Sequence, residues 1–285
     1  MKKNFLKITT LLFSFLFLAG CTKEEALPDT PIVGLGGDTW TKGEIDNYIT
    51  TNFTDPYNIE VKYKWDPYEV NFSKNLTPVM ENKVMPALDA VLKIWMAPYE
   101  KVIGKAFLRK FAPRQFVLVG SAEYNSDGTI TLGQAEGGKK ITLLVINDFD
   151  KKDVPEVKRM LHTIHHEFAH ILHQNILYQR EFKQLNPEWY TATWYNSSIA
   201  DANAQGLVTD YAKASADEDF VEIISYLLVE GQAAFDAIVE ANPGKAASIL
   251  RQKEAMVMAY FQNAYQIDFR ALQAETQEGL AEITQ

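Results

Sequence analysis

The chain has 285 residues, of which 28 are Lys or Arg and 37 are Asp or Glu, giving a formal net charge of −9 at pH 7. This acidic balance argues against nucleic acid as a partner, because phosphate backbones attract basic surfaces. A single cysteine excludes an internal disulfide, and the length suffices for one domain with a sizeable core.

The first 20 residues have the pattern of a bacterial lipoprotein signal peptide. Lys2, Lys3 and Lys7 lie in front of or within an apolar run that is too short for a stable membrane span. The run ends in Leu-Ala-Gly before Cys21, which resembles a lipobox and predicts cleavage before Cys21 with lipid attached to its thiol. The alternative is an ordinary buried or free cysteine after an uncleaved helix. Cleavage would remove three lysines and no acidic residue, changing the formal charge from −9 to −12.

Residues 21–38 contain two prolines and three glycines and are predicted to form a flexible tether that holds the following domain off a membrane. Glu24 and Glu25, soon after the cysteine, resemble the export signal of surface lipoproteins in Bacteroidetes. This resemblance favours the outer face of the outer membrane, and the periplasmic leaflet or an ordinary solvated linker are the alternatives. The folded domain is expected over residues 39–285.

The first half of this domain is expected to combine helices with a small sheet. Residues 40–48 are predicted as a short helix capped by Thr41, and residues 52–75 as strands or extended loops. Residues 77–102 are predicted as a helix with Pro78 in its first turn, packed against the helix described next. Apolar strands are predicted at residues 116–119, 129–132 and 140–146, around a turn at 125–128.

Residues 156–178 contain no Gly or Pro and carry apolar residues at the spacing of a helix with one buried stripe. All five histidines lie here, and His166-Glu167-Phe168-Ala169-His170 is an H-E-x-x-H motif. Residues four apart share a helix face, so the two imidazoles can reach one cation while Glu167 lies beside the open position. This is the ligand pattern of a catalytic zinc, and the alternative is a polar helix face that is rich in histidine.

A catalytic zinc needs a third protein ligand. His173 lies one helical turn past His170 and about 10 Å along the axis from His166, so it is a poor ligand and a better neighbour. We therefore expect a carboxylate from a second helix.

The second helix is predicted just after residue 215, capped by Ser215 or Asp217, with one buried apolar face. Glu218 and Glu222 are four apart on it, so one can bind the metal while the other orients a ligand. Asp217 is placed with Glu222 and His173 among the residues that surround the ligands. Acidic residues that merely suit the helix dipole are the alternative for this segment.

Aromatic residues at positions 184–206 could wall a substrate cleft, but packing beneath a long loop is the safer interpretation. Residues 232–285 are predicted to form two helices, separated at Asn242-Pro243-Gly244 and packed on the helix of Glu218.

The spacing of these motifs resembles a known group of zinc peptidases. H-E-F-x-H, then Tyr211, then E-x-F-x-E beginning seven residues later at Glu218, is similar to the gluzincin site of anthrax lethal factor and pro-pro endopeptidases. With the lipobox and chain length, HHEFAHILHQ resembles the Bacteroidetes zinc-binding metallopeptidases called substrate import-associated zinc metallohydrolase lipoproteins. The resemblance implies that Glu218 is the third zinc ligand, that Tyr211 faces the scissile carbonyl and that Glu222 supports the site. The two glutamates exchange roles if their order is reversed.

We therefore expect an α+β, zincin-like metallopeptidase with a small mixed sheet and a predominantly helical C-terminal half, as one body or two lobes around a Zn2+ cleft. Glu167 would act as general base on a peptide or protein substrate, and residues 133–146 would add the substrate as a β strand or serve as core sheet. The membrane would be reached through Cys21, and the resemblance suggests a TonB-dependent import complex as partner. The alternatives are an accessory zinc-binding lipoprotein of an outer-membrane import system, or a hydrolase of non-peptide amides or esters.

Overall fold

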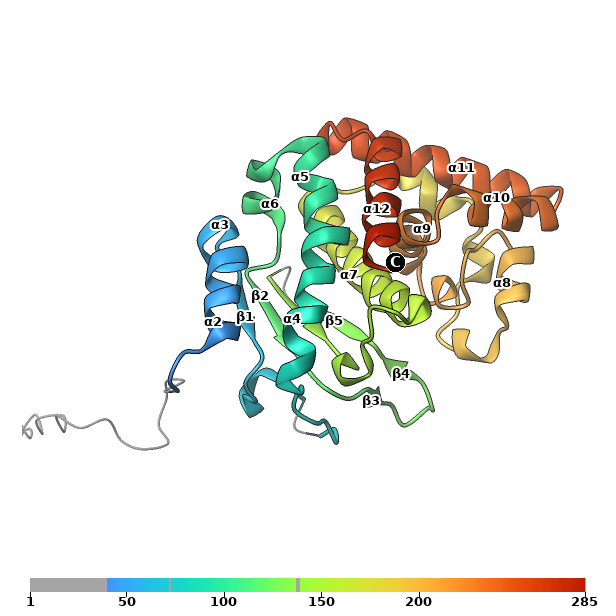
Figure 1. The fold of residues 1–285 in the computed structure, drawn as a ribbon. Helices are drawn as coiled ribbons and strands as arrows, with labels where there is room; N and C mark the ends of the chain where they lie inside the picture. The colour runs from blue at the N-terminus through green and yellow to red at the C-terminus, as the bar shows by residue number, and fades with distance from the viewer. Residues whose placement is uncertain (1–39, 72, 137–138, 285) are drawn as a thin grey trace, which may run out of the picture. The chain divides into compact units, whose positions relative to one another are not determined.

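The computed structural model describes residues 40–71, 73–136 and 139–284 (Figure 1). Its contacts divide the chain into Met1–Thr41 and Lys42–Gln285, and the second unit is the body described below. The predicted signal peptide, Cys21 and the tether lie outside the described residues. Among the residues described, every helix falls short of the length and apolar character that crossing a membrane requires.

The second unit begins with a short helical run. Helix α2 (Glu44–Ile49) starts after Gly43, whose N–H donates to the Asp46 carboxylate, so the prediction of Thr41 as its cap is wrong. The run continues through the π-helix η2 (Thr50–Thr54) and α3 (Asp55–Tyr57). The extended structure predicted from residue 52 is therefore wrong for its first part, because a proline in the first turn of a helix loses no hydrogen bond. Strand β1 (Glu60–Lys62) follows, and then a 3-10 turn, η3 (Pro67–Glu69).

A long helical segment then crosses the body. It consists of α4 (Glu81–Ala90), the π-helix η4 (Val91–Met96) and α5 (Ala97–Ile103), with α6 (Lys105–Phe111) after Gly104. It begins later than predicted, because Pro78 forms a β bridge with Val119 and keeps the chain extended there. The predicted packing is confirmed, since the buried ring of Trp95 meets Phe168 at a centroid distance of 5.1 Å.

The main sheet has the order β1-β2-β6-β5 and is mixed. β2 (Gln115–Leu118) pairs in parallel with β1 and with β6 (Lys140–Leu143), whereas β5 (Gly133–Glu136) pairs antiparallel with β6. The edge strands are thus β1 and β5, and of the segment predicted to receive substrate β5 lies at an edge whereas β6 lies inside the sheet. β3 (Glu123–Tyr124) and β4 (Ile130–Thr131) form a separate antiparallel hairpin.

The helix that bears the H-E-x-x-H motif is α7 (Val154–Asn175). The Asp153 carboxylate accepts the Glu156 N–H at 3.3 Å and caps its first turn. Figure 1 shows α7 beside the main sheet, and its contacts include β5, β6 and the central helix α9 (Ala216–Val229). Its buried apolar face includes Val157, Leu161, Ile164 and Phe168.

The C-terminal half is helical, which confirms the predicted α+β class (Figure 1). Ser215 is the cap of α9, since its Oγ accepts the Glu218 N–H at 3.1 Å. α9 is buried on nearly every side rather than on one face. It packs against α10 (Gln232–Ala241), α11 (Lys245–Tyr260) and α12 (Phe269–Ile283), the last of which was not predicted as a separate helix. The additional break follows Gln266, which adopts a left-handed conformation without being glycine.

Candidate active site

Helices α7 and α9 bring three donors together at the centre of the site. One oxygen of Glu218 lies 3.1 Å from His166 Nε2 and 3.2 Å from His170 Nε2. A tetrahedral zinc with bonds of about 2.0 Å separates its ligands by about 3.3 Å, so this spacing fits one zinc ion. Burial raises the pKa of Glu218, but hydrogen bonds from both histidines outweigh it and lower that pKa to about 2. The carboxylate is therefore ionised, as a metal ligand must be.

A buried carboxylate lies behind the first histidine. His166 Nδ1 is 2.7 Å from one oxygen of Glu222, which also contacts His162 Nε2 at 2.9 Å, and Thr209 donates its hydroxyl to the other oxygen at 2.5 Å. Burial raises the pKa of Glu222, but the charges and hydrogen bonds of the two histidines hold it well below its usual range. A carboxylate at Nδ1 fixes the ring so that Nε2 faces the metal.

The second histidine is oriented by a neighbour on its own helix. His170 Nδ1 lies 3.0 Å from His173 Nε2. Burial, with His170 alongside, lowers the pKa of His173 to about 4, so His173 is neutral at pH 7 and can accept the N–H of His170. The structure thus places His173 beside His170, and not among the three side chains that could bind the metal.

Asp217 stays a predicted neighbour of the ligands, and its charge acts on His173, which it was grouped with. Its carboxylate accepts hydrogen bonds from Tyr178 and from Lys183, and none joins it to the three donors. Successive helical residues are about 100° apart around the axis, so Asp217 points away from the side that carries Glu218.

Two further polar side chains line the same centre. Glu167 is 9% exposed, and burial raises the pKa of its carboxyl. Tyr211 lies in a 3-10 turn, η9 (Tyr211–Lys213), with its ring centroid 5.7 Å from that of His166. Burial and the nearby Glu218 charge raise the pKa of Tyr211, so its hydroxyl stays protonated and able to donate. The Asp210 carboxylate holds this turn by accepting the Tyr211 N–H at 2.9 Å.

Two cavities meet at these residues and form a cleft. The larger, of about 530 Å³, reaches toward Trp194 and Asp210, and the smaller, of about 390 Å³, reaches toward Gln134 and Gln174. Gly133 of β5 lines both, so the free edge of the sheet runs along the cleft. The aromatic segment at residues 184–206 serves both predicted purposes, since Trp194 lines the cleft while Tyr190 packs against the buried Ala202, Leu207 and Ala212.

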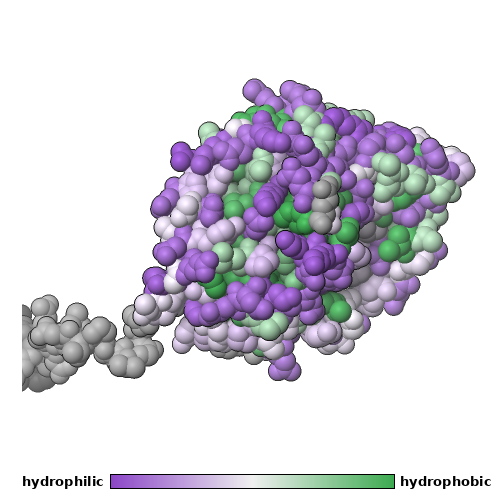
Figure 2. Space-filling model, in the orientation of Figure 1, coloured by the Kyte–Doolittle hydropathy of each residue, from purple (hydrophilic) through white to green (hydrophobic). Residues whose placement is uncertain are grey.

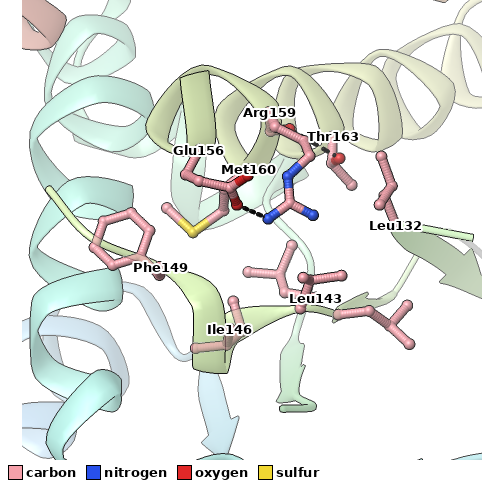
Figure 3. Close-up of a pocket in the computed structure, with 10 residues that line it drawn as sticks. Leu132, Leu143, Ile146, Phe149, Glu156, Arg159, Met160 and Thr163 are labelled. Carbon is pink, nitrogen blue, oxygen red and sulfur yellow. Dashed lines mark hydrogen bonds and ion pairs between the residues drawn. The ribbon is translucent and has the colours of Figure 1, made fainter. Parts of the chain in front are cut away.

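The start of β5 lies unusually close to α7. A Cβ on Gly133 would come within 2.1 Å of the Thr163 methyl carbon, so only glycine fits there. Figure 3 shows the small pocket next to this contact, where Arg159 pairs with Glu156 and Thr163 lies beside Leu132. The larger cavity shares Leu132 and Thr163 with this pocket, so the two adjoin at these residues.

Sequence reasoning assigned no role to four side chains of this site. His162 is four residues before His166, so helical spacing could have shown that the two share a face. Thr209 and Asp210 directly precede Tyr211, but their contacts with α9 and η9 depend on how the loop folds. Trp194 was named only as one of several aromatic residues.

A helix with H-E-x-x-H beside a free sheet edge, completed by a glutamate from a second helix, defines a zincin-like protein. Residues 38–270 match the model of the family described as "Putative zinc-binding metallo-peptidase". The chain belongs to this family, and its cofactor is Zn2+. The family expected from the motifs is therefore confirmed.

One solved structure supports the same assignment. It is described as "Crystal structure of a putative zinc-binding metallo-peptidase from Bacteroides caccae ATCC 43185 at 2.10 A resolution". The two chains are 33% identical, with a TM-score of 0.72, and the match covers 84% of this chain and 92% of the other. A comparison with curated proteins gave no match.

Proposed function

We propose that this protein is a zinc-dependent peptidase that hydrolyses peptide bonds with a glutamate as general base. The observation that carries the proposal is the placement of Glu167 and Tyr211 beside the three donors, at the junction of the two cavities. A merely structural zinc site would need neither residue. This favours an enzyme over an accessory zinc-binding lipoprotein.

Bound Zn2+ supplies Lewis-acid chemistry, lowering the pKa of its water and polarising a carbonyl. His166, His170 and Glu218 would hold the ion. Glu167 accepts a proton from the attacking water and returns it to the leaving amine, for which its raised pKa suits it. Tyr211 donates a hydrogen bond to the oxygen on which charge develops, and such a donor is worth on the order of a few kcal/mol.

The free edge of β5 is proposed to hold the substrate in an extended conformation. β6 forms hydrogen bonds with the backbone groups on one side of β5. The backbone N–H and C=O groups on the other side of β5 lie along the cleft. An added peptide strand would satisfy them. A non-peptide amide or ester could be hydrolysed by the same groups, but it would leave this edge unused.

The proposed localisation is the bacterial cell surface, where a lipid on Cys21 would anchor the protein beside a TonB-dependent importer. The support is the lipobox and the acidic residues that follow it. Replacement of Cys21 by Ser should release the protein from membranes, and externally added protease should digest the wild-type protein on intact cells. A wild-type protein that is protected until the outer membrane is opened would place it on the periplasmic leaflet.

Digestion of a diverse peptide library tests the activity. The zinc-loaded full-length protein in detergent should cut peptides, and Glu167→Gln should retain one zinc and cut none. Equal cleavage by both proteins would assign the activity to a contaminant. If neither protein cuts although zinc is bound, the accessory or non-peptide alternative gains support.

A further inference from the structure

The direction of β5 decides which cavity receives which part of a bound peptide. Leu132 and Gly133, at the start of the strand, line the larger cavity, whereas Gln134 and Ala135 line the smaller. Antiparallel pairing is slightly more stable per residue than parallel pairing. A peptide antiparallel to β5 runs from the smaller cavity toward the larger, so the residue after the cut bond enters the larger cavity.

Among the described residues, the larger cavity is lined by acidic side chains without Lys or Arg to balance them. Glu222 is occupied by His162, His166 and Thr209, as shown above. Asp210 is different, because its only hydrogen bond in the described part of the chain is the one that Oδ1 accepts from the N–H of Tyr211. No ion pair within the described ranges compensates its charge.

The remaining lining suits a long side chain. Leu132 and Thr163 line the cavity, where Leu132 offers apolar contacts, and Trp194 stands beside Tyr211 with ring centroids 4.8 Å apart. Lys and Arg carry an apolar stem with a charged end, and an indole ring attracts cations. The volume of about 530 Å³ accommodates either side chain.

We propose that this cavity binds a Lys or Arg side chain of the residue that follows the cut bond, with Asp210 and Trp194 receiving its charge. The proposal rests on the peptidase function and assigns its substrate class. Figure 2 shows hydrophilic residues interspersed with hydrophobic ones on the face seen there.

The test uses peptides that differ only at the position after the cut bond, carrying Arg, Lys, Gln, norleucine or Glu. For the zinc-loaded full-length protein, kcat/KM should be about tenfold higher with Arg or Lys than with Gln, as a charge-assisted contact implies. Glu should be the poorest. In Asp210→Asn the ratio of Lys to Gln should fall to within about twofold. Asparagine keeps an oxygen for the Tyr211 N–H, and a ratio cancels any general loss of activity.

Two controls separate charge from structure. Asp89→Asn makes the same charge change at a half-exposed position of α4, where Asp89 pairs with Lys93, and its Lys-to-Gln ratio should equal that of the wild type. Binding of the labelled peptides to the zinc-loaded Glu167→Gln protein, measured by fluorescence anisotropy, should show the same order as kcat/KM and the same loss with Asp210→Asn.

Cleavage with no preference for Lys or Arg, or a preference that survives Asp210→Asn, would overturn this subsite and leave the peptidase function intact. A cationic preference for the residue before the cut bond would refute the assigned direction and with it the subsite. Absence of cleavage in every peptide would refute the peptidase function, and the subsite would fall with it.

Discussion

Replacement of Lys253 by Met should strongly destabilise the protein. Lys253 and Asp219 are both completely buried and form an ion pair, and Lys253 also donates to the Gly206 carbonyl at 2.9 Å. The Tyr190 hydroxyl donates to Asp219 at 2.8 Å. Burial lowers the pKa of Lys253 and raises that of Asp219, so neither charge is tolerated there without the other.

The expected magnitude follows from leaving the Asp219 carboxylate without its cation. Breaking a buried ion pair costs roughly 3–5 kcal/mol. For a domain of this size, each kcal/mol lowers Tm by about 2–4 °C, so Lys253→Met should lower Tm by roughly 6–20 °C. Thermal unfolding of the full-length protein followed by circular dichroism measures this change.

The double variant Lys253→Met with Asp219→Leu is the matched comparison. The double variant leaves no unpaired buried charge, so it should regain most of the stability that the single variant loses. The Tyr190 hydroxyl and the Gly206 carbonyl each still lose a hydrogen-bond partner. A single variant within about 3 °C of the wild type, or a double variant as unstable as the single one, would refute this reasoning.

The same variant gives a pH test. An aspartate whose folded pKa is raised contributes stability that is present at low pH and lost as pH rises through that pKa. The deficit of Lys253→Met should therefore shrink as pH falls toward the ordinary value of 3.8 for Asp219. A deficit that stayed constant between pH 7.5 and 4.5 would show that the remaining carboxyl is not the cause.

Three further changes test the site and the sheet. Gly133→Ala should lower Tm and kcat/KM by pushing β5 from α7, and adding Thr163→Ser, which removes the opposing methyl group, should restore part of both in a double-mutant cycle. Thr209→Val removes the hydroxyl bonded to the buried glutamate behind His166, so zinc affinity measured by chelator competition should fall about tenfold. The hydrogen bond from Lys62 lowers the pKa of Glu69, so the ionised Glu69 stabilises the folded protein above pH 4.5 and this contribution is lost as the pH falls below that value. In Lys62→Met the urea midpoint of unfolding should therefore change less between pH 5 and 3 than in the wild type.

The parts of the site that the sequence predicted are those set by helical spacing. His166 and His170, and likewise Glu218 and Glu222, are four residues apart, so their shared faces follow from the helix itself. Ser215 could be named as a cap because capping depends on the next three residues only. The family model and the Bacteroides structure confirm the family and the fold class that these motifs indicated.

What the sequence could not predict depends on distant contacts or on a missing local signal. The parallel pairing of Glu60 with Gln115 joins strands that are far apart in the chain, and β5 is an edge strand because its neighbour β6 pairs with the more distant β2 on its other side. The break at Gln266 carries neither Gly nor Pro, so periodicity continued across it. Asp217 accepts its hydrogen bonds from Tyr178 and Lys183, because a sequence neighbour of a ligand need not share that ligand's contacts.

Helix α9 joins the metal centre to the C-terminal core through consecutive residues. Glu218 faces the histidines of α7, whereas Asp219, the next residue, faces Lys253 of α11. Glu222 returns to the side of Glu218 one turn later and meets His166. Because α10, α11 and α12 all pack on α9, its orientation is fixed by the C-terminal helices. A change that loosens those helices should therefore weaken zinc binding, even where it touches none of the donors.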